Sequence, residues 1–284
     1  MTNNNLGVCN YPEDKTKAKN PPRRFGEVGS KIKKGMPAVC SILFVLIVWE
    51  VAVRLTGVSA DILPSPIRVV RMLFINRALF WTHILPTLKE TMIGLGATIL
   101  AAVILAVLCD FFPTVRRFVY PILVISQTVP IIVIAPLFVI WFGYGLFPKI
   151  VIIIIVTFFS IAVALTDGFD STEPEVVSLL KSMGATKWQQ FYYVRLPAAL
   201  PSFFTGLRIA ITWSITAAIY GEYVGAEKGL GIFMQICKND FRTDLVLGSV
   251  LIISALSLIL FGVVALLRKL IIPWHSTAKA GEKQ

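Results

Sequence analysis

The sequence predicts an all-α integral membrane protein, and its composition, hydropathy and charge spacing each indicate this. The 284 residues are 56% hydrophobic and 15% charged, with a mean hydropathy of +0.77. A soluble globular domain is about 45–50% apolar and about 25% charged. Four windows without Lys, Arg, Asp or Glu approach or exceed the roughly 18 apolar residues that mark a membrane span. These windows are 91–109, 118–148, 150–166 and 245–267.

Six segments are apolar enough over sufficient length to cross a hydrocarbon layer of about 30 Å as helices. The predicted spans are 38–56, 88–110, 118–142, 149–167, 202–224 and 246–268. After the turn Leu63-Pro64-Ser65-Pro66, apolar residues at helical spacing predict an amphipathic helix at the membrane surface. The chain therefore divides into an N-terminal tail (1–37), a transmembrane domain (38–268) and a C-terminal tail (269–284).

The lysines and arginines predict how the spans are oriented. With the N-terminus inside, the inner segments carry seventeen of these residues, and the outer segments with the span ends carry nine. Cytoplasmic loops are enriched in Lys and Arg, so both tails are expected in the cytoplasm. The first 37 residues are polar and basic and lack the apolar core of a signal peptide. In a membrane protein the net charge of +11 reports orientation, so we expect no nucleic-acid partner; the basic tail could also contact anionic lipid.

Polar residues inside the predicted spans are candidates for a translocation pathway. The third span contains several prolines, which a span tolerates only beside protein or a water-filled cavity, so it is either a kinked packing helix or a helix that borders a pathway. The Ser and Thr hydroxyls in the spans could instead bond their own helix backbone. A carboxylate inside a membrane is costly, which favours an outer gate or a contact with a binding protein for Glu222. The pathway candidates are Ser126, Gln127, Pro130, Ser214 and Glu222.

The inner loop 168–201 has the most informative pattern in the chain. Thr172 and Glu175 have the spacing of a capping box that starts a helix, and Gly184 has the residue type that ends one. A second capping box at Thr186 and Gln189 predicts a short helix that ends at Leu196-Pro197. Both helices have apolar faces outside the membrane, which either pack on span ends or bind a protein partner.

Here the sequence resembles a known family, the permeases of importer-type ATP-binding cassette (ABC) transporters. Their cytoplasmic loop has the pattern E-A-A-x3-G-x9-I-x-L-P, and Gly184, nine residues and Val194-Arg195-Leu196-Pro197 fit its second half. The nitrate, sulfonate and taurine branch is also similar at further segments, over about residues 60–270. These segments are 63–66, 129–130, 135–137, 141–145, 206–208, 221–225 and 229–231. The sequence departs from the pattern at E-A-A, where it has Ser178, Leu179 and Leu180.

The resemblance implies a type I ABC importer permease fold, with a coupling-helix loop between spans 4 and 5 that docks on an ATPase. It implies a multi-pass subunit of the bacterial inner membrane, with two ATPase copies, a second permease copy and an extracytoplasmic binding protein as partners. The solute would be a sulfonate-, taurine- or nitrate-like anion or a vitamin precursor. The implied docking residues are Glu175, Ser178, Leu179, Leu180, Met183, Gly184, Ala185, Thr186, Leu196 and Pro197.

The chain itself shows no sign of catalysis. It contains no G-x-x-x-x-G-K-[ST] loop for phosphate, so ATP and Mg²⁺ are expected on the partner subunit and no cofactor on this chain. Its two histidines are isolated, and its four cysteines form no metal-ligand pattern, so no metal is expected. The alternative function is an ATP-independent channel or an ion-coupled carrier. Such carriers usually have two related halves. In this chain the first half of the transmembrane domain, 38–142, is not similar in sequence to the second half, 149–268.

Overall fold

The computed structural model describes residues 25–126, 128 and 130–273, and of residues 25–36, 38 and 39 it describes only the backbone. Over these ranges the chain is helical and contains no β-strand. Two compact units are present, Met1–Ala52 and Val53–Gln284. The first contains most of α1 (Phe25–Thr56), a helix that includes the predicted first span, 38–56. The functional residues predicted above all belong to the second unit, except Gln127, which lies outside the described residues.

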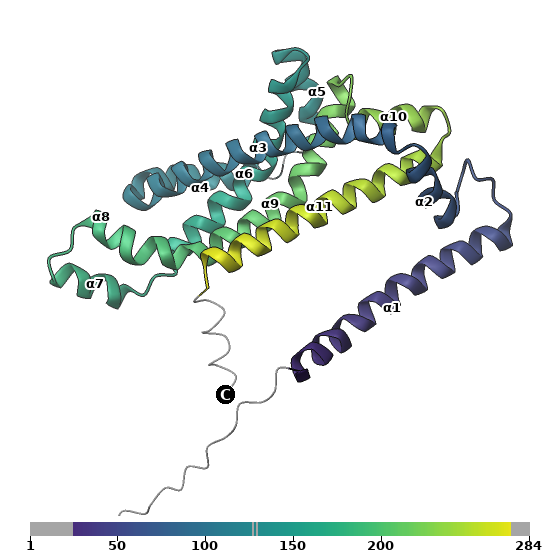
Figure 1. The fold of residues 1–284 in the computed structure, drawn as a ribbon. Coiled ribbons are helices and arrows are strands. Elements are labelled where there is room, and N and C mark those ends of the chain that lie inside the picture. The colour runs from purple at the N-terminus through teal and green to yellow at the C-terminus, as the bar shows by residue number, and fades with distance from the viewer. Residues whose placement is uncertain (1–24, 127, 129, 274–284) are drawn as a thin grey trace, which may run out of the picture. The chain divides into compact units, whose positions relative to one another are not determined.

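Four long helices form the centre of the second unit and lie side by side in Figure 1. They are α3 (Arg77–Phe111), α6 (Leu146–Asp170), α9 (Leu196–Gly225) and α11 (Thr243–Ile271). Each contains a stretch long and apolar enough to cross a membrane, and α9 is continuous with the helical turns before it, from Lys187. They correspond to four of the six predicted spans, but α3 begins eleven residues before the predicted start at 88.

Small residues allow α6 and α9 to pack closely along each other. A Cβ added to Gly206 would lie 2.4 Å from the carbonyl oxygen of Ser160, and one added to Gly168 would lie 2.8 Å from the Cβ of Ser202. Such distances leave room for hydrogen only. Membrane helices associate through close packing of small residues, so these glycines fix the contact between the two central helices.

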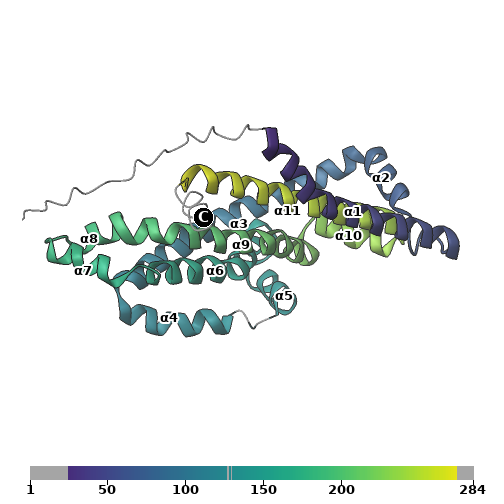
Figure 2. The same cartoon turned by 90° about the horizontal axis from the view of Figure 1, so that it is seen from below.

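The predicted third span, 118–142, is not one helix. It is divided into α4 (Pro113–Ser126) and α5 (Ile131–Phe142), whose axes differ by 104°. Pro130 is the N-cap residue of α5, and a proline there has no N–H to continue a preceding helix. The described residues therefore contain four candidate spans, or five if this bent pair counts as one. Seen from below, α4 runs beside α6 and leads to α5 (Figure 2).

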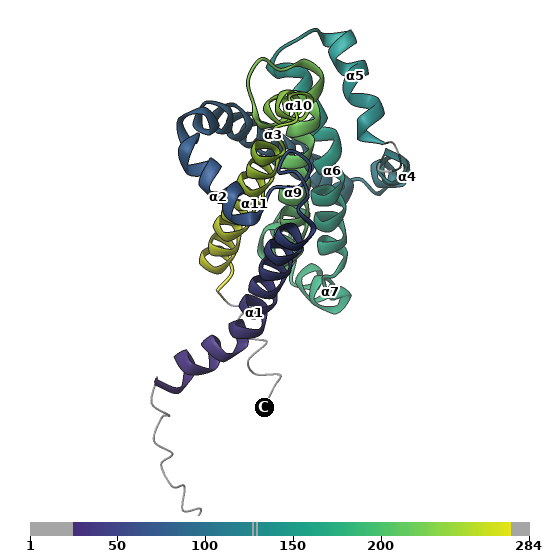
Figure 3. The ribbon, with the colours of Figure 1, turned by 90° about the vertical axis from the view of Figure 1, so that its right-hand side faces the viewer.

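The two ends of the bundle carry different short helices. At one end, called the α10 end here, α10 (Leu230–Asn239) packs on α9 and α11. The predicted amphipathic helix is α2 (Pro66–Ile75), whose N-cap Ser65 accepts a hydrogen bond from the Arg68 backbone N–H at 3.4 Å. Figure 3 shows α2 on the side of α11, opposite α4 and α5. The other end, called the loop end, carries α7 (Pro174–Ser182) and α8 (Lys187–Gln190).

The structure confirms the predicted helix–glycine–helix but corrects two details. The N-cap residue of α7 is Glu173, without a side-chain hydrogen bond, and the hydroxyl of Thr172 is buried without a partner. The first predicted capping box is therefore wrong. The short helix also does not end at Leu196-Pro197: a π-helical turn, η1 (Phe191–Arg195), joins α8 to α9. Because such a turn widens the helix, the missing N–H of Pro197 does not break it.

Candidate functional site

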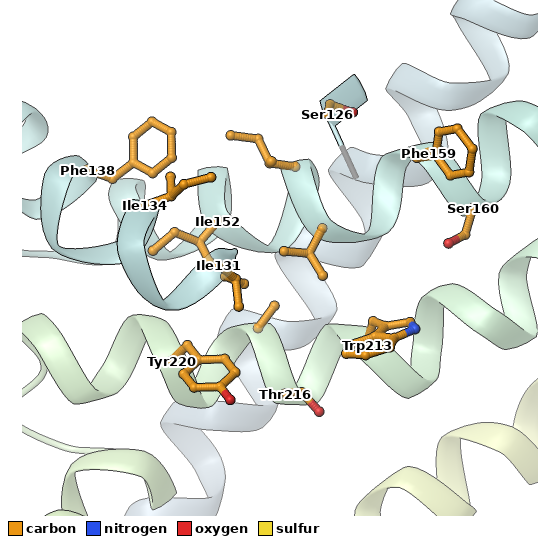
Figure 4. A pocket seen from close by; sticks show the side chains of 13 residues that line it. Ser126, Ile131, Ile134, Phe138, Ile152, Phe159, Ser160, Trp213, Thr216 and Tyr220 are labelled. Carbon is orange, nitrogen blue, oxygen red and sulfur yellow. The ribbon is translucent and has the colours of Figure 1, made fainter. Parts of the chain in front are cut away.

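A cavity of about 300 Å³ lies between α4, α5, α6 and α9 (Figure 4). Helix α9 contributes Trp213, Thr216 and Tyr220, which lie along one face of that helix in the figure. Both helices of the broken span also contribute, α4 with Ser126 and α5 with Ile131, Ile134 and Phe138, and α6 supplies further residues. The lining residues are Ser126, Ile131, Ile134, Phe138, Ile152, Ile155, Val156, Phe159, Ser160, Trp213, Thr216, Ala217 and Tyr220.

The lining is aliphatic and aromatic, and its polar side-chain groups are four hydroxyls and the indole N–H of Trp213. Ser126, Ser160, Thr216 and Tyr220 carry these hydroxyls, and none of the described lining residues is charged. Binding sites of this kind are mostly apolar with a few polar groups that orient the ligand. A carboxylate or sulfonate would find no cation among these residues, whereas an uncharged ring could stack on Trp213, Tyr220 or Phe138.

A buried polar cluster lies at the α10 end. Glu222 is 0% exposed, and its carboxylate accepts hydrogen bonds from the Thr87 hydroxyl at 2.5 Å and from the Gly231 backbone N–H at 2.6 Å. Thr87 Oγ1 also accepts a hydrogen bond from the Leu230 N–H at 2.9 Å. These two N–H groups are the first of α10, whose own N-cap residue, Gly229, has no side chain. Glu222 and Thr87 therefore cap α10 from two other helices.

The glycines around Glu222 are required by its position. A Cβ on Gly229 would lie 2.3 Å from Cδ of Glu222, and Gly229 has φ of +144°. A Cβ on Gly231 would lie 2.9 Å from Cβ of Glu222. The imidazole of His83 completes the turn, with Nδ1 3.0 Å from the Gly229 carbonyl oxygen. The sequence Gly229-Leu230-Gly231 thus forms a close-fitting turn around a carboxylate.

An ion pair lies beside this cap. Lys149, near the start of α6, donates to Glu90 Oε1 in α3 at 2.6 Å, and both side chains are 7% exposed. Gly221 of α9 touches Lys149, since an added Cβ would lie 3.3 Å from its Cγ. Buried charges in membrane proteins are almost always paired. With Glu222, this pair ties α3, α6, α9 and α10 together at one end of the bundle.

The loop end has an exposed apolar surface instead. The side chains of Leu179 on α7, Met183 directly after α7 and Trp188 on α8 are exposed. Gly184, between these helices, has φ of +83°, and an added Cβ would meet no atom within 4 Å. Thr186 and Gln189 form the predicted capping box at the start of α8. The turn is thus set by local geometry, while its apolar side chains remain uncovered in this chain.

Comparison with known proteins identifies the family of this chain. Residues 94–274 match the profile of the binding-protein-dependent transport system inner membrane component. This match covers more than half of the chain, including the cavity, the loop and α10. The chain belongs to this family. It is a permease subunit of an ABC importer, a membrane-spanning transporter subunit, and the alternative of an ATP-independent channel or carrier is set aside.

Relatives of the permease are similar over most of their length. The formylaminopyrimidine transport permease protein ThiX of Halalkalibacterium halodurans is 40% identical over 82% of this chain and 93% of its own. The riboflavin transport system permease protein RibX of Chloroflexus aurantiacus is 30% identical, over 86% and 91%. The taurine transport system permease protein TauC of Escherichia coli is 31% identical, over 84% and 89%.

A solved structure supports the fold. The crystal structure of an amino acid ABC transporter with histidines matches with a TM-score of 0.55 and 18% sequence identity, over 70% of this chain and 95% of that one. The permease therefore has the predicted type I ABC importer permease fold. Its family name and its apolar helices place it in the inner membrane as a multi-pass protein.

The predicted docking residues of the permease lie together at the loop end. All are on α7, in the turn after it, or at the junction of η1 and α9. Ala185, Leu196 and Pro197 are half-buried, whereas Glu175, Ser178 and Met183 are exposed. That these residues dock on an ATPase stays a prediction.

The predicted pathway residues do not lie together. Ser126 lines the cavity, and Gln127 lies outside the described residues. Pro130 is exposed at the start of α5. Ser214 is buried and donates to the Ile211 carbonyl at 2.9 Å, and Glu222 is bound in the cap of α10. Neither belongs to the described lining of the cavity.

Sequence reasoning did not single out Thr87, Glu90 or Lys149. The available signal was a pair of opposite charges at equivalent depth, Glu90 just inside the predicted second span and Lys149 at the start of the fourth. Charges inside spans mark a partner or a pathway. The contact joins residues 59 positions apart, so only the packing of α3 against α6 identifies the partner.

Proposed function

We propose that this permease imports a small, uncharged, ring-containing solute of the vitamin-precursor type, such as a substituted pyrimidine. The cavity carries this proposal, because its described lining combines Trp213, Tyr220 and Phe138 with hydroxyl groups and contains no cation. A planar ring can stack on the aromatic side chains while its nitrogens bond to the hydroxyls. The names of the Halalkalibacterium and Chloroflexus relatives, a formylaminopyrimidine and a riboflavin permease, agree with this class.

A sulfonate or taurine is the second candidate, favoured by the similarity to the Escherichia coli taurine permease. An anion moving through this cavity would lose its hydration without a Lys or Arg among the described lining residues. Burying an unpaired charge is costly. The cavity therefore supports an anionic solute less well than an uncharged ring.

We further propose the assembly that the family implies. Two ATPase copies dock on the loop ends of two permease copies, and an extracytoplasmic binding protein delivers the solute at the α10 end. This arrangement is supported by the exposed side chains of Leu179, Met183 and Trp188. Large apolar side chains that would otherwise face water often mark a surface where another protein binds. The partner ATPase binds ATP and Mg²⁺, while this chain binds no cofactor. The loop end and both termini are then cytoplasmic.

The solute proposal is tested by uptake into proteoliposomes that contain the permease with its ATPase and binding protein. A pyrimidine precursor should be taken up, and taurine should not compete. Trp213→Leu should raise the KM for the ring about fivefold, because an aromatic pair contributes about 0.5–1.5 kcal/mol. Trp81→Leu, at an exposed tryptophan of α3 outside the described cavity lining, is the control. Uptake of taurine with no uptake of a ring solute would assign the anion instead.

Orientation and energy supply are tested separately. In a chain with its four cysteines replaced by alanine, single cysteines at Gln235 on α10 and Lys181 on α7 report each end. An impermeant thiol reagent on intact cells should label Gln235→Cys only; labelling of Lys181→Cys alone would reverse the orientation. The purified permease should hydrolyse no ATP until the ATPase is added. ATP hydrolysis by the permease alone would contradict the proposal that the partner subunit is the ATPase.

A further inference from the structure

The helices of the loop end are tied to the membrane bundle at both of their ends. Asp170, the last residue of α6, lies four residues before α7 begins, and Arg195, the last residue of η1, follows α8 after the π-helical turn. Each of these two residues forms an ion pair with the corner between α3 and α4. We call these ion pairs the two loop anchors.

The first anchor joins Arg116, near the start of α4, to Asp170. It is bidentate: Nη1 donates to Oδ1 at 2.7 Å, and Nη2 donates to Oδ2. Parallel N–H···O bonds of this kind fix the relative orientation of the two groups. The side chains are 37% and 50% exposed, so water weakens the attraction and the pair contributes little to stability.

The second anchor joins Arg195 to Asp110, the residue before the last of α3. Arg195 Nη1 donates to Oδ1 of Asp110, whose side chain is 8% exposed. The carboxylate is thus nearly buried, and removing the arginine would leave it without its ion pair. Breaking a buried pair has a much larger effect than breaking an exposed one. The π-helical turn places Arg195 here, since the Leu196 N–H bonds to the Phe191 carbonyl, one residue further back than in an α-helix.

Aromatic packing stiffens the same junction. The ring of Phe111, the last residue of α3, lies 5.8 Å from that of Trp188 on α8 and 5.3 Å from that of Phe191 in η1. Phe191 also lies 5.4 Å from Phe169 of α6. Three segments that are distant in sequence, the end of α3, the end of α6 and the continuous α8–η1 stretch, therefore share one aromatic cluster beside the anchors. These ring contacts connect α8 and η1 to the end of α3, directly before the α3–α4 corner.

The α3–α4 corner leads directly to the cavity. From Arg116, α4 runs to Ser126 in the cavity lining, and α5 after the bend contributes Ile131, Ile134 and Phe138. We propose that Asp110, Arg116, Asp170 and Arg195 are positioning residues that convert ATPase-driven motion of the loop into movement of the broken span that walls the cavity. This inference rests on the proposed docking of an ATPase at the loop end.

The test uses the complete complex of permease, ATPase and binding protein in proteoliposomes. Three quantities are measured: co-purification of the ATPase, the ATP hydrolysis rate, and solute uptake per ATP hydrolysed. Arg195→Ala should leave co-purification unchanged, because Arg195 is not one of the exposed apolar side chains of the loop, and should lower uptake per ATP about tenfold. Arg195→Lys should retain at least half of the coupling. Arg116→Ala should lower it about threefold, because its pair is more exposed.

A double variant separates coupling from stability. Asp110→Leu with Arg195→Met removes the unpaired carboxylate, so thermal stability should return to near wild type. The link between η1 and α3 is still absent, so uptake per ATP should stay low. A purely structural pair predicts recovery of both quantities. Arg117→Ala is the matched control, an exposed arginine next to Arg116 for which the described residues provide no ion pair.

Each outcome decides the proposal. It is overturned if Arg195→Ala couples like wild type, or if the double variant recovers uptake per ATP together with stability. If Arg195→Ala fails to assemble, the double variant decides by the same criterion. Failure of the wild-type complex to couple uptake to ATP would instead refute the proposed function, before any variant is compared.

Discussion

The two ends of the permease are held together in opposite ways. At the α10 end, charged and polar side chains are buried and bond to each other and to backbone N–H groups, as with Glu222, Thr87 and the Glu90–Lys149 pair. At the loop end, ion pairs are partly exposed and large apolar side chains face outward. The first end is held by polar contacts within one chain, whereas the second leaves large apolar side chains uncovered, at the surface where we propose that the ATPase docks.

Helix capping shows the difference at the level of single residues. Helix α8 is capped by its own Thr186, whose hydroxyl accepts from the Gln189 N–H at 3.3 Å. Helix α10 is capped by Glu222 of α9 and Thr87 of α3. A local cap can form whenever the chain turns there, but a cap supplied by other helices requires that those helices be packed first. We therefore expect the cap of α10 to be lost whenever the bundle unfolds, whereas the cap of α8 depends only on its own turn.

The largest effect is expected from breaking the buried ion pair. Lys149→Met leaves Glu90 charged and unpaired between α3 and α6, which should lower the unfolding free energy by about 3–5 kcal/mol. Thermal unfolding of the detergent-purified permease, followed by gel filtration, measures this. Lys149→Met with Glu90→Leu should recover most of the loss. Lys181→Met, on the exposed loop, is the control, and equal melting temperatures for the two lysine variants would contradict the comparison.

The cap of α10 should be the next most sensitive feature. Gly229→Ala puts a Cβ against the Glu222 carboxylate at a residue with φ of +144°. Glu222→Ala removes the acceptor for the Gly231 N–H, while the Thr87 hydroxyl keeps the His83 carbonyl as an acceptor at 3.1 Å. An unsatisfied buried donor costs about 1–3 kcal/mol. Both variants should melt well below wild type, with Glu222→Gln in between. If Gly229→Ala melts as wild type, the turn does not enclose the carboxylate as described.

The matching glycine at the loop end should behave differently. Gly184 also has positive φ, but its Cβ position is open, so Gly184→Val adds only the left-handed strain of about 1–2 kcal/mol in one turn. Expression and melting should stay near wild type, while ATPase co-purification and uptake are lost. Gly184→Asn, which tolerates this conformation, should retain both. If Gly184→Val binds the ATPase as wild type does, the loop is not the element that couples the permease to the ATPase.

The smallest effect is expected at Ser178. This residue is exposed on α7. Replacing it with the glutamate of the family pattern should cause no clash and remove no side-chain hydrogen bond. Surface substitutions usually change stability by less than about 0.5 kcal/mol. Ser178→Glu should therefore match wild type in melting, ATPase co-purification and uptake. A clear loss of uptake would show that the departure from E-A-A is specific to this transporter.

Much of the fold could be read from local patterns. The apolar windows located α6 and α11 within a few residues, and Gly184 with the Thr186 capping box placed the turn between α7 and α8. The same kind of reasoning was wrong where prolines were used to place the ends and bends of helices. Pro197 has the appearance of a helix end, yet η1 carries the helix through it. The prolines of 118–142 indicated a kink but not a 104° change of direction.

The sequence by itself determined the membrane class, the family and the loop, because each depends on the order and spacing of residues along the chain. Tertiary structure alone decided the cavity, the cap of α10 and the loop anchors. Glu222 meets Thr87 across 135 positions, and Arg195 meets Asp110 across 85. Such contacts depend on how α3, α6 and α9 pack, and that packing is set by shape, through glycines such as Gly206, rather than by any periodic pattern.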